Sequence, residues 1–212
     1  MKKLCICACL LGLATGVLPA ESFLLFGGSF GYTSQNTAAL DPWSATSLGV
    51  FGQSYFDSNG PLGSYTAATV GLVVGSQSNG TSLDPTQYQT FSLNILSGIG
   101  YRVALGGLTA IAGAGLYIGS TSLSAVNASL SSYVAGGVGA GIGASLLYSL
   151  AYNWGIGLNV NASYYFTIPG DVVSTLSPSG FTVFGGIGMI YFYQPATDMG
   201  SAASFFSGQP AS

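Results

Sequence analysis

Apolar and polar residues alternate with a period of two along most of this chain. In residues 156–168, large apolar side chains such as Ile156 and Leu158 alternate with small or polar ones such as Gly157 and Asn159. Successive side chains of a β-strand point to opposite faces, so this period predicts strands. The pattern predicts eight strands, at residues 23–32, 47–56, 66–75, 90–100, 108–119, 133–147, 156–168 and 181–193.

The connections between these strands alternate in length. Longer connections span 33–46, 76–88, 120–131 and 169–180, and shorter ones span 57–64, 101–107 and 149–155. Long outer loops and short periplasmic turns are typical of outer-membrane barrels. We therefore expect an all-β fold, an eight-stranded antiparallel up-and-down transmembrane β-barrel with both termini on the periplasmic side.

A transmembrane helix fits the chain poorly. No segment beyond residue 20 has the roughly 18 uninterrupted apolar residues that a helical span needs. The nearest candidate, residues 134–150, contains Gly137, Gly139, Gly141 and Gly143. Glycine costs about 1 kcal/mol at each interior position of a helix, and a spacing of two is that of a strand.

The charged residues lie outside the predicted strands. The chain has three Lys and Arg residues, six Asp and Glu residues and no histidine, for a formal net charge of −3. Arg102 and all the acids fall in predicted turns, loops or termini. This is expected in a membrane, where a lipid-facing cation costs about 2–4 kcal/mol at the midplane. The scarcity of basic residues also argues against a nucleic-acid partner.

Aromatic residues are expected to form two girdles, one at each membrane interface. The predicted outer girdle comprises Tyr32, Phe91, Tyr117, Tyr133, Tyr164, Phe166 and Phe181. The predicted inner girdle comprises Phe56, Tyr65, Tyr101, Tyr148, Trp154 and Tyr193.

The two ends of the chain differ in composition from the strands. Lys2 and Lys3 precede an apolar run that ends at Ala20, just before Glu21, as in a signal peptide. A lipoprotein site at Cys9 is disfavoured, because the apolar stretch before it is too short. We predict a signal peptide at 1–20, an outer-membrane barrel at 21–193 and a flexible C-terminal tail at 194–212.

In the number of strands and the alternating lengths of their loops, residues 21–193 resemble the eight-stranded outer-membrane barrels of the OmpA, OmpX and OmpW type. A looser resemblance is to small OmpW-like barrels of spirochaetes. The resemblance implies a bacterial outer-membrane location and insertion by the barrel-assembly machinery. One departure is that such proteins usually end on an aromatic residue, whereas residues 194–212 follow Tyr193 here.

The residues opposite the lipid-facing set predict an uncharged interior. The predicted lumen-lining residues are Thr69, Val73, Ser92, Asn94, Ile111, Tyr117, Ser145, Asn159, Asn161, Tyr165 and Phe184. Glycines are more frequent on this inward face than on the outward one, which leaves two interpretations open. They relieve crowding in a small, sharply bent barrel, with Phe51, Tyr55, Tyr165, Phe184 and Phe192 filling the freed space, or they leave a narrow lumen.

The sequence offers little catalytic chemistry. It has no histidine, and its cysteines all lie within the predicted signal peptide, so we expect neither an enzyme nor a cofactor. Asp41, Asp84 and Asp171 lie in three outer loops and could converge on a cation. Each adjoins a turn-forming proline or Pro-Gly pair, so turn formation is the preferred interpretation and no metal site is expected.

Two classes of function remain. The first is a narrow uncharged lumen that passes or holds small neutral or hydrophobic solutes, as in a porin-like transport protein of the OmpW type. The alternative is a surface-exposed adhesin that contacts host molecules through its outer loops, or a structural outer-membrane protein. A soluble lipocalin-like or sandwich fold is the non-membrane alternative. Outer-membrane lipid is an expected partner in either membrane class.

Overall fold

Antiparallel strands make up almost all of the described chain in this computed structural model, which covers residues 22–37, 40–57, 60–105, 107–127, 129–151, 153–167 and 177–193. The predicted signal peptide, the whole predicted tail and Asp171 lie outside these residues. The elements are β1 (Ser22–Thr37), β2 (Leu40–Asp57), β3 (Leu62–Ser78), β4 (Thr81–Leu83), the 3-10 helix η1 (Pro85–Gln87), β5 (Tyr88–Leu105), β6 (Leu108–Ala125), β7 (Tyr133–Ser149), β8 (Trp154–Thr167) and β9 (Ser177–Tyr193). Within the described part of the chain, no helix is long and apolar enough to cross a membrane.

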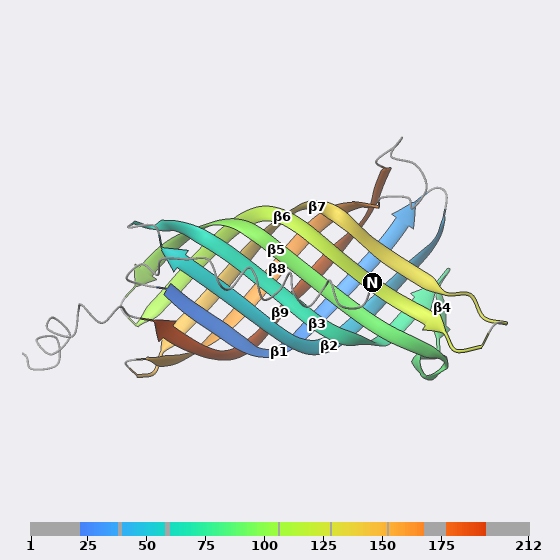
Figure 1. The fold of residues 1–212 in the computed structure, drawn as a ribbon, viewed down its shortest axis with the longest axis horizontal. Coiled ribbons are helices and arrows are strands. Elements are labelled where there is room, and N and C mark those ends of the chain that lie inside the picture. The colour runs from blue at the N-terminus through green and yellow to red at the C-terminus, as the bar shows by residue number, and fades with distance from the viewer. Residues whose placement is uncertain are drawn as a thin grey trace, which may run out of the picture.

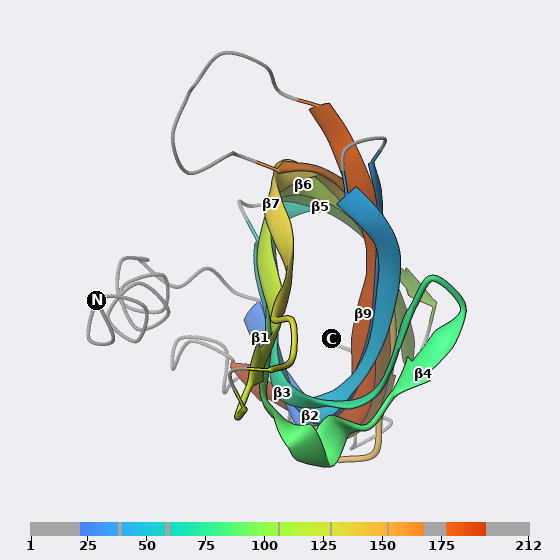
Figure 2. The same cartoon turned by 90° about the vertical axis from the view of Figure 1, so that its right-hand side faces the viewer.

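The strands form a closed barrel (Figures 1 and 2). Each wall strand pairs antiparallel with its neighbours in the order β2-β1-β9-β8-β7-β6-β5-β3, and a further ladder between β2 and β3 closes the wall. The first and last strands meet from Ser22 opposite Tyr193 to Gln35 opposite Gly180. The predicted eight-stranded up-and-down topology is confirmed, because β4 is a short addition to β3 outside the wall.

The strands are longer than the sequence pattern predicts. β2 pairs with β3 as far as Asp57, and β5 pairs with β6 as far as Leu105. Asp41, Asp57 and Arg102 therefore lie in strands, and the prediction that no strand carries a charge is wrong. Backbone pairing continues beyond the part of each strand that bears apolar side chains, and the apolar pattern detects only that part.

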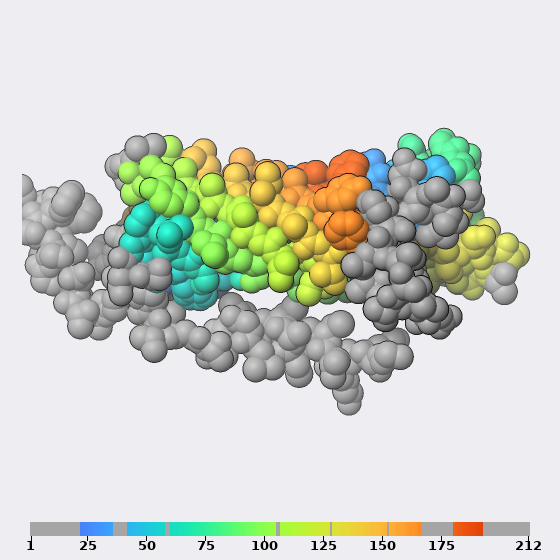
Figure 3. All heavy atoms as spheres, turned by 90° about the horizontal axis from the view of Figure 1, so that it is seen from above, coloured from blue at the N-terminus to red at the C-terminus, as the bar shows by residue number. Residues whose placement is uncertain are grey.

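The outward side chains form an apolar belt around the wall. The outward residues predicted for the strand over 23–32, such as Phe26 and Phe30, are exposed, as are Leu116 on β6 and Ile142 on β7. Soluble monomers rarely expose so large a continuous apolar surface, whereas a transmembrane barrel requires one. In Figure 3 the side chains of β5 to β8, green to orange, cover the wall along the length of the barrel. This surface fits a lipid environment.

The two ends of the barrel differ in their connections. One end carries the connections at 58–61, 106–107 and 150–153 and both Ser22 and Tyr193; we call it the turn end and the opposite one the loop end. The predicted longer connection at 33–46 is wrong, because β1 extends to Thr37 and β2 begins at Leu40 at the loop end. At the loop end, the tight turn at Asn79 and Gly80 has positive φ values of 51° and 76° and reverses β3 into β4. The regular ladder between β3 and β5 stops at Gly71 opposite Ser92, and beyond it the Val73 backbone N–H donates to Thr90 Oγ1 at 3.2 Å.

Candidate functional site

The predicted lumen-lining residues all lie inside the barrel, where each is buried. They do not surround an open channel, because their side chains pack and hydrogen-bond across the interior. The polar members other than Tyr165 belong to two hydrogen-bond networks, one nearer the turn end and one nearer the loop end. The Tyr165 hydroxyl donates to the backbone carbonyl of Ser34 at 3.1 Å. The apolar members Ile111 and Phe184 belong to the central core, and Val73 belongs to a second apolar cluster at the loop end.

The network nearer the turn end is built around Tyr65. Its hydroxyl donates to Asn161 Oδ1 at 2.6 Å and accepts from Asn159 Nδ2 at 2.7 Å. Asn159 Nδ2 also donates to Ser145 Oγ at 3.1 Å, and Ser145 donates to Gln53 Oε1 at 2.9 Å. This network joins β3, β8, β7 and β2 across the barrel without a charged group.

The network nearer the loop end is built around Asn94. Its Oδ1 accepts from the Tyr117 hydroxyl at 2.7 Å, and its Nδ2 donates to Thr69 Oγ1 at 3.2 Å. Ser92 and Thr121 share a hydrogen bond of 3.2 Å, and Thr121 shares another of 3.2 Å with Thr33. Hydroxyl and amide groups thus fill the interior near the loop end, where an open channel would have its entrance.

Glycines on the inward face make room for aromatic rings. A β-carbon on Gly113 would lie 2.8 Å from Cγ of Tyr65, and one on Gly186 would overlap the ring of Phe51. A β-carbon on Gly119 would likewise overlap the hydroxyl of Tyr117. The structure therefore favours the first interpretation of the glycines, in which they relieve crowding and aromatic side chains fill the space.

Apolar side chains close the remaining interior. Toward the turn end, Leu25, Leu147 and Ile190 join the central core, and Phe23 stacks on Tyr55 with ring centroids 5.8 Å apart. Toward the loop end, the cluster that contains Val73 also includes the following residues: Trp43, Ala45, Leu83, Tyr88, Leu123, Ala135 and Tyr133. The described barrel is thus packed with side chains along its length.

A charged pair lies at the turn end. Arg102 Nη2 contacts Asp57 Oδ2 at 3.1 Å, and Asp57 Oδ1 accepts from the Gly60 backbone N–H at 2.8 Å. The Tyr55 hydroxyl donates to the carbonyl of Pro61 at 2.9 Å, so the same turn is held from the interior. Asp57 has the inward parity of Tyr55, and Arg102 lies between the outward-facing Tyr101 and Val103. The two charges therefore meet inside the end of the barrel, which explains how strands can carry them.

Three aromatic residues predicted for the girdles face the interior instead, among them Tyr117, which the sequence also predicted to line the lumen. Tyr65 and Tyr117 are fully buried, and Tyr133 packs on Trp43 in the loop-end cluster. Their parity along β3, β6 and β7 sets this direction, whereas the girdle prediction used only their height along the strand. Exposed aromatics of the outer and inner sets do occur on the wall, among them Tyr32, Phe91, Tyr164, Phe181, Tyr101, Tyr148 and Trp154.

Sequence reasoning missed several interior polar residues. Gln53, Gln35 and Thr33 are buried, and Gln35 Oε1 accepts from the Trp43 indole at 3.0 Å. Gln53 shares parity with buried Phe51 and Tyr55 on β2, so strand parity alone could have placed it inside. The irregular polar run around it hid that signal.

Metal-binding chemistry is sparse in the described residues, where no group of three or more His, Cys, Asp or Glu side chains gathers. Asp84 caps η1, and its carboxylate accepts from Thr86 Oγ1 at 2.7 Å and from the Thr86 backbone N–H at 3.0 Å. These hydrogen bonds lower the pKa of Asp84 below its ordinary value. Its geometry agrees with the turn interpretation.

Comparison with solved structures places this barrel beside two others. Neisserial surface protein A shares 12% identity with a TM-score of 0.53, over 81% of this chain and 97% of that one. The outer membrane protein OprG of Pseudomonas aeruginosa shares 12% identity with a TM-score of 0.53, over 85% of this chain and 99% of that one. Neither a protein-family model nor a curated protein matches the sequence. At this identity the likeness establishes the fold, an eight-stranded barrel similar to small barrels of bacterial outer membranes.

Proposed function

We propose that this chain is a bacterial outer-membrane barrel with a closed interior, which anchors a surface-exposed loop end that contacts molecules outside the cell. The observation that carries this proposal is the packed interior. Two uncharged hydrogen-bond networks, and aromatic rings that pack against inward-facing glycines, fill the space that a channel would need. Such a core makes the wall rigid. Because the interior is filled, the loop end is the part of the barrel that remains free to contact molecules outside the cell. The absence of histidine from the sequence agrees with a non-enzymatic role.

The placement in the membrane rests on surface chemistry. The apolar belt, with Leu116, Ile142 and Ile187 among its most exposed members, meets lipid. Arg102 and Asp57 lie at the turn end. With a signal peptide at 1–20, export and insertion by the barrel-assembly machinery would leave the short turns in the periplasm and the loop end outside.

The loop end has a polar rim above the belt, with the exposed carboxylate of Asp84 beside β4. Thr46, Gln77, Gln89 and Ser124 are exposed there, and Thr81 and Ser82 are exposed on β4. These groups donate and accept hydrogen bonds without ionic attraction. We therefore propose that host molecules or other external partners are bound chiefly by shape and hydrogen bonding.

Adhesion and flux measurements test this function. Cells displaying the chain should bind immobilised extracellular-matrix proteins more than cells that lack it. A variant with residues 79–87 replaced by a two-residue turn should lose this binding while keeping its heat-modifiable migration on a detergent gel. Adhesion that is equal with and without the barrel would contradict the proposal.

Passage of small neutral solutes is a second candidate, favoured by the end of the backbone ladder between β3 and β5, beyond which the link between the described residues is the hydrogen bond from the Val73 N–H to Thr90 Oγ1. Beyond Gly71 and Ser92 these strands no longer share a ladder, and Val73 of the loop-end cluster lies just there. An apolar solute that displaced part of this cluster would have a route through the wall. In liposomes, uptake of glycerol or toluene above the protein-free level would support this candidate. Unchanged uptake would leave surface contact as the supported function.

A further inference from the structure

An exposed Asn-Gly pair forms the turn between β3 and β4. Asn79 and Gly80 are both exposed, and their positive φ values match the two-residue hairpin turn that this dipeptide favours. The Asn79 backbone N–H donates to the carbonyl of Pro42 at 3.0 Å. The Gly80 N–H has no hydrogen-bond partner in the described part of the chain, and a β-carbon on Gly80 would meet nothing within 4 Å. The Gly80 nitrogen is therefore accessible to a neighbouring reactive group.

Few contacts hold this turn to the barrel. β4 is three residues long and pairs with β3 from Ser76 opposite Leu83 to Ser78 opposite Thr81. It stands outside the wall (Figure 2), and Thr81 is exposed. Short pairings whose hydrogen bonds face solvent open at little cost in free energy. Local opening lets Asn79 rotate about its Cα–C bond while the ladders of the wall stay intact.

We propose that Asn79 is a site of spontaneous deamidation through a cyclic imide formed with Gly80. The Gly80 backbone nitrogen attacks Asn79 Cγ, and the bond between Cγ and the side-chain nitrogen breaks. The proton of the Gly80 nitrogen leaves with the amide group as ammonia. Water then opens the imide ring at either carbonyl, which yields aspartate or isoaspartate. Glycine suits this reaction because it has no side chain to hinder the attack.

The second Asn-Gly pair of the sequence, Asn59 and Gly60, should react more slowly. The Gly60 N–H donates to Asp57 Oδ1 at 2.8 Å, and the other Asp57 oxygen contacts Arg102 at 3.1 Å. The Gly60 nitrogen must give up the proton that this carboxylate holds before it can attack. The hydrogen bond therefore protects the pair at the turn end, whereas the pair at the loop end has no such protection.

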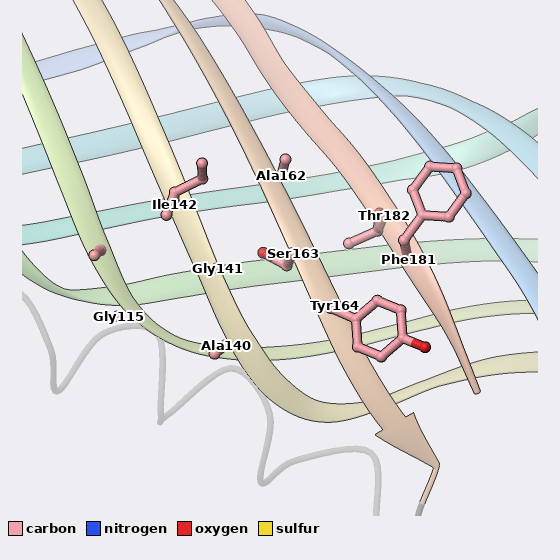
Figure 4. A pocket seen from close by; sticks show the side chains of 10 residues that line it. Gly115, Ala140, Gly141, Ile142, Ala162, Ser163, Tyr164, Phe181 and Thr182 are labelled. Carbon is pink, nitrogen blue, oxygen red and sulfur yellow. The ribbon is translucent and has the colours of Figure 1, made fainter. Parts of the chain in front are cut away.

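Other asparagines lack this combination of exposure and a following glycine. Asn161 is buried and is followed by Ala162, which lies opposite Ile142 in the ladder between β7 and β8 (Figure 4). Asn127 is exposed at the loop end, but an alanine follows it, and its Oδ1 accepts from the Ser129 N–H at 3.3 Å. Exposure alone thus does not single out Asn79, but exposure beside an unprotected glycine nitrogen does.

Deamidation changes both the charge and the backbone of the loop end. Either product places a carboxylate at residue 79, and isoaspartate also adds a methylene group to the backbone. A two-residue turn sets the register of its hairpin, so the longer backbone should disrupt the pairing of β4. Leu83, which packs against the loop-end cluster, should then lose its place there. The reaction does not depend on the proposed contact function, but its effect on external binding rests on that function.

Peptide mapping by mass spectrometry of the barrel in lipid nanodiscs tests the proposal. The barrel is incubated at mildly alkaline pH beside a synthetic peptide of residues 75–83, which shows that the conditions support the reaction. Asn79 should convert several-fold faster than Asn59 and Asn127 in the same sample and should yield both aspartate and isoaspartate. A rate at Asn79 no higher than at Asn59 or Asn127 would overturn the proposal, as would aspartate without isoaspartate.

Two variants locate the cause of the difference in rate. Asn79→Gln should abolish conversion at this position, because the longer side chain closes the corresponding ring far more slowly. Asp57→Ala frees the Gly60 N–H and should speed conversion at Asn59 several-fold, with the rate at Asn79 unchanged. Heat-modifiable migration on a detergent gel shows whether this variant keeps its fold. An unchanged rate at Asn59 in the folded variant would overturn the assigned protection.

Adhesion of fresh and converted barrel separates the reaction from its consequence. Converted barrel should bind immobilised extracellular-matrix proteins several-fold less than fresh barrel. Equal binding by the two would refute the effect on external contact. Fresh barrel that binds none of these proteins would refute the contact function, whereas the conversion of Asn79 is measured without it.

Discussion

Gly113 on β6 faces the ring of Tyr65 so closely that a β-carbon on the glycine would lie 2.8 Å from Cγ and Cδ1 of the ring. Tyr65 cannot simply rotate away, because its hydroxyl is fixed by Asn161 and Asn159 on β8. The packing of one side chain thus links three strands of the wall. Similar relationships between glycine and aromatic residues explain why so glycine-rich a barrel has a filled interior.

Gly113→Ala should therefore destabilise the barrel. Overpacking a filled interior costs about 1–3 kcal/mol, which the alanine's better strand propensity only partly offsets. The measurement is the free energy of unfolding in urea from lipid vesicles. Gly28→Ala is the control, because a β-carbon there meets nothing within 4 Å and faces outward. Equal stability of the two variants would show that the interior is looser than described.

Tyr65→Phe should weaken the network nearer the turn end. The change keeps the ring but removes the group that donates to Asn161 and accepts from Asn159. Leaving buried amide groups short of a partner costs about 1–3 kcal/mol. The same urea titration measures the loss, with lipid-facing Tyr148→Phe as the control. No difference between these variants would mean that the amides find other partners.

The alternation of the sequence was sufficient to predict the barrel and the direction of most side chains. Period-two parity is a local property of the strand, so it placed Leu116 outward and Asn159 inward without knowledge of the neighbours. Parity also placed Tyr117 among the lumen-lining residues and contained the answer for Tyr65, although height along the strand assigned both residues wrongly to the girdles. Local parity was the more reliable guide.

The filled interior was not predictable in detail from the sequence. The stagger between strands that are distant in the chain, such as β3 against β6 and β8, determines which aromatic ring packs against which glycine. Asn94 meets Tyr117 for the same reason, through the register of β5 with β6.

The ion pair at the turn end should contribute measurably to stability. Arg102→Gln removes a charged hydrogen bond to Asp57, whose side chain is only 9% exposed. Such bonds contribute about 1.5–3 kcal/mol, and this one should change little with salt because the pair is largely shielded. A double-mutant cycle with Asp57→Asn measures the coupling. A coupling near zero would mean that the turn is held by the Gly60 and Tyr55 contacts alone.

Acidification should release the loop that Asp84 caps. Hydrogen bonds from Thr86 lower the pKa of Asp84 from its ordinary value of 3.8, so its carboxylate favours the folded loop. A lowered pKa gives a contribution that is complete above the ordinary value and is lost as the pH falls through the lowered one. The Thr86 amide resonance should therefore titrate with a midpoint below 3.8. Asp84→Asn should abolish that titration, whereas a midpoint at or above 3.8 would show that the cap is not formed in solution.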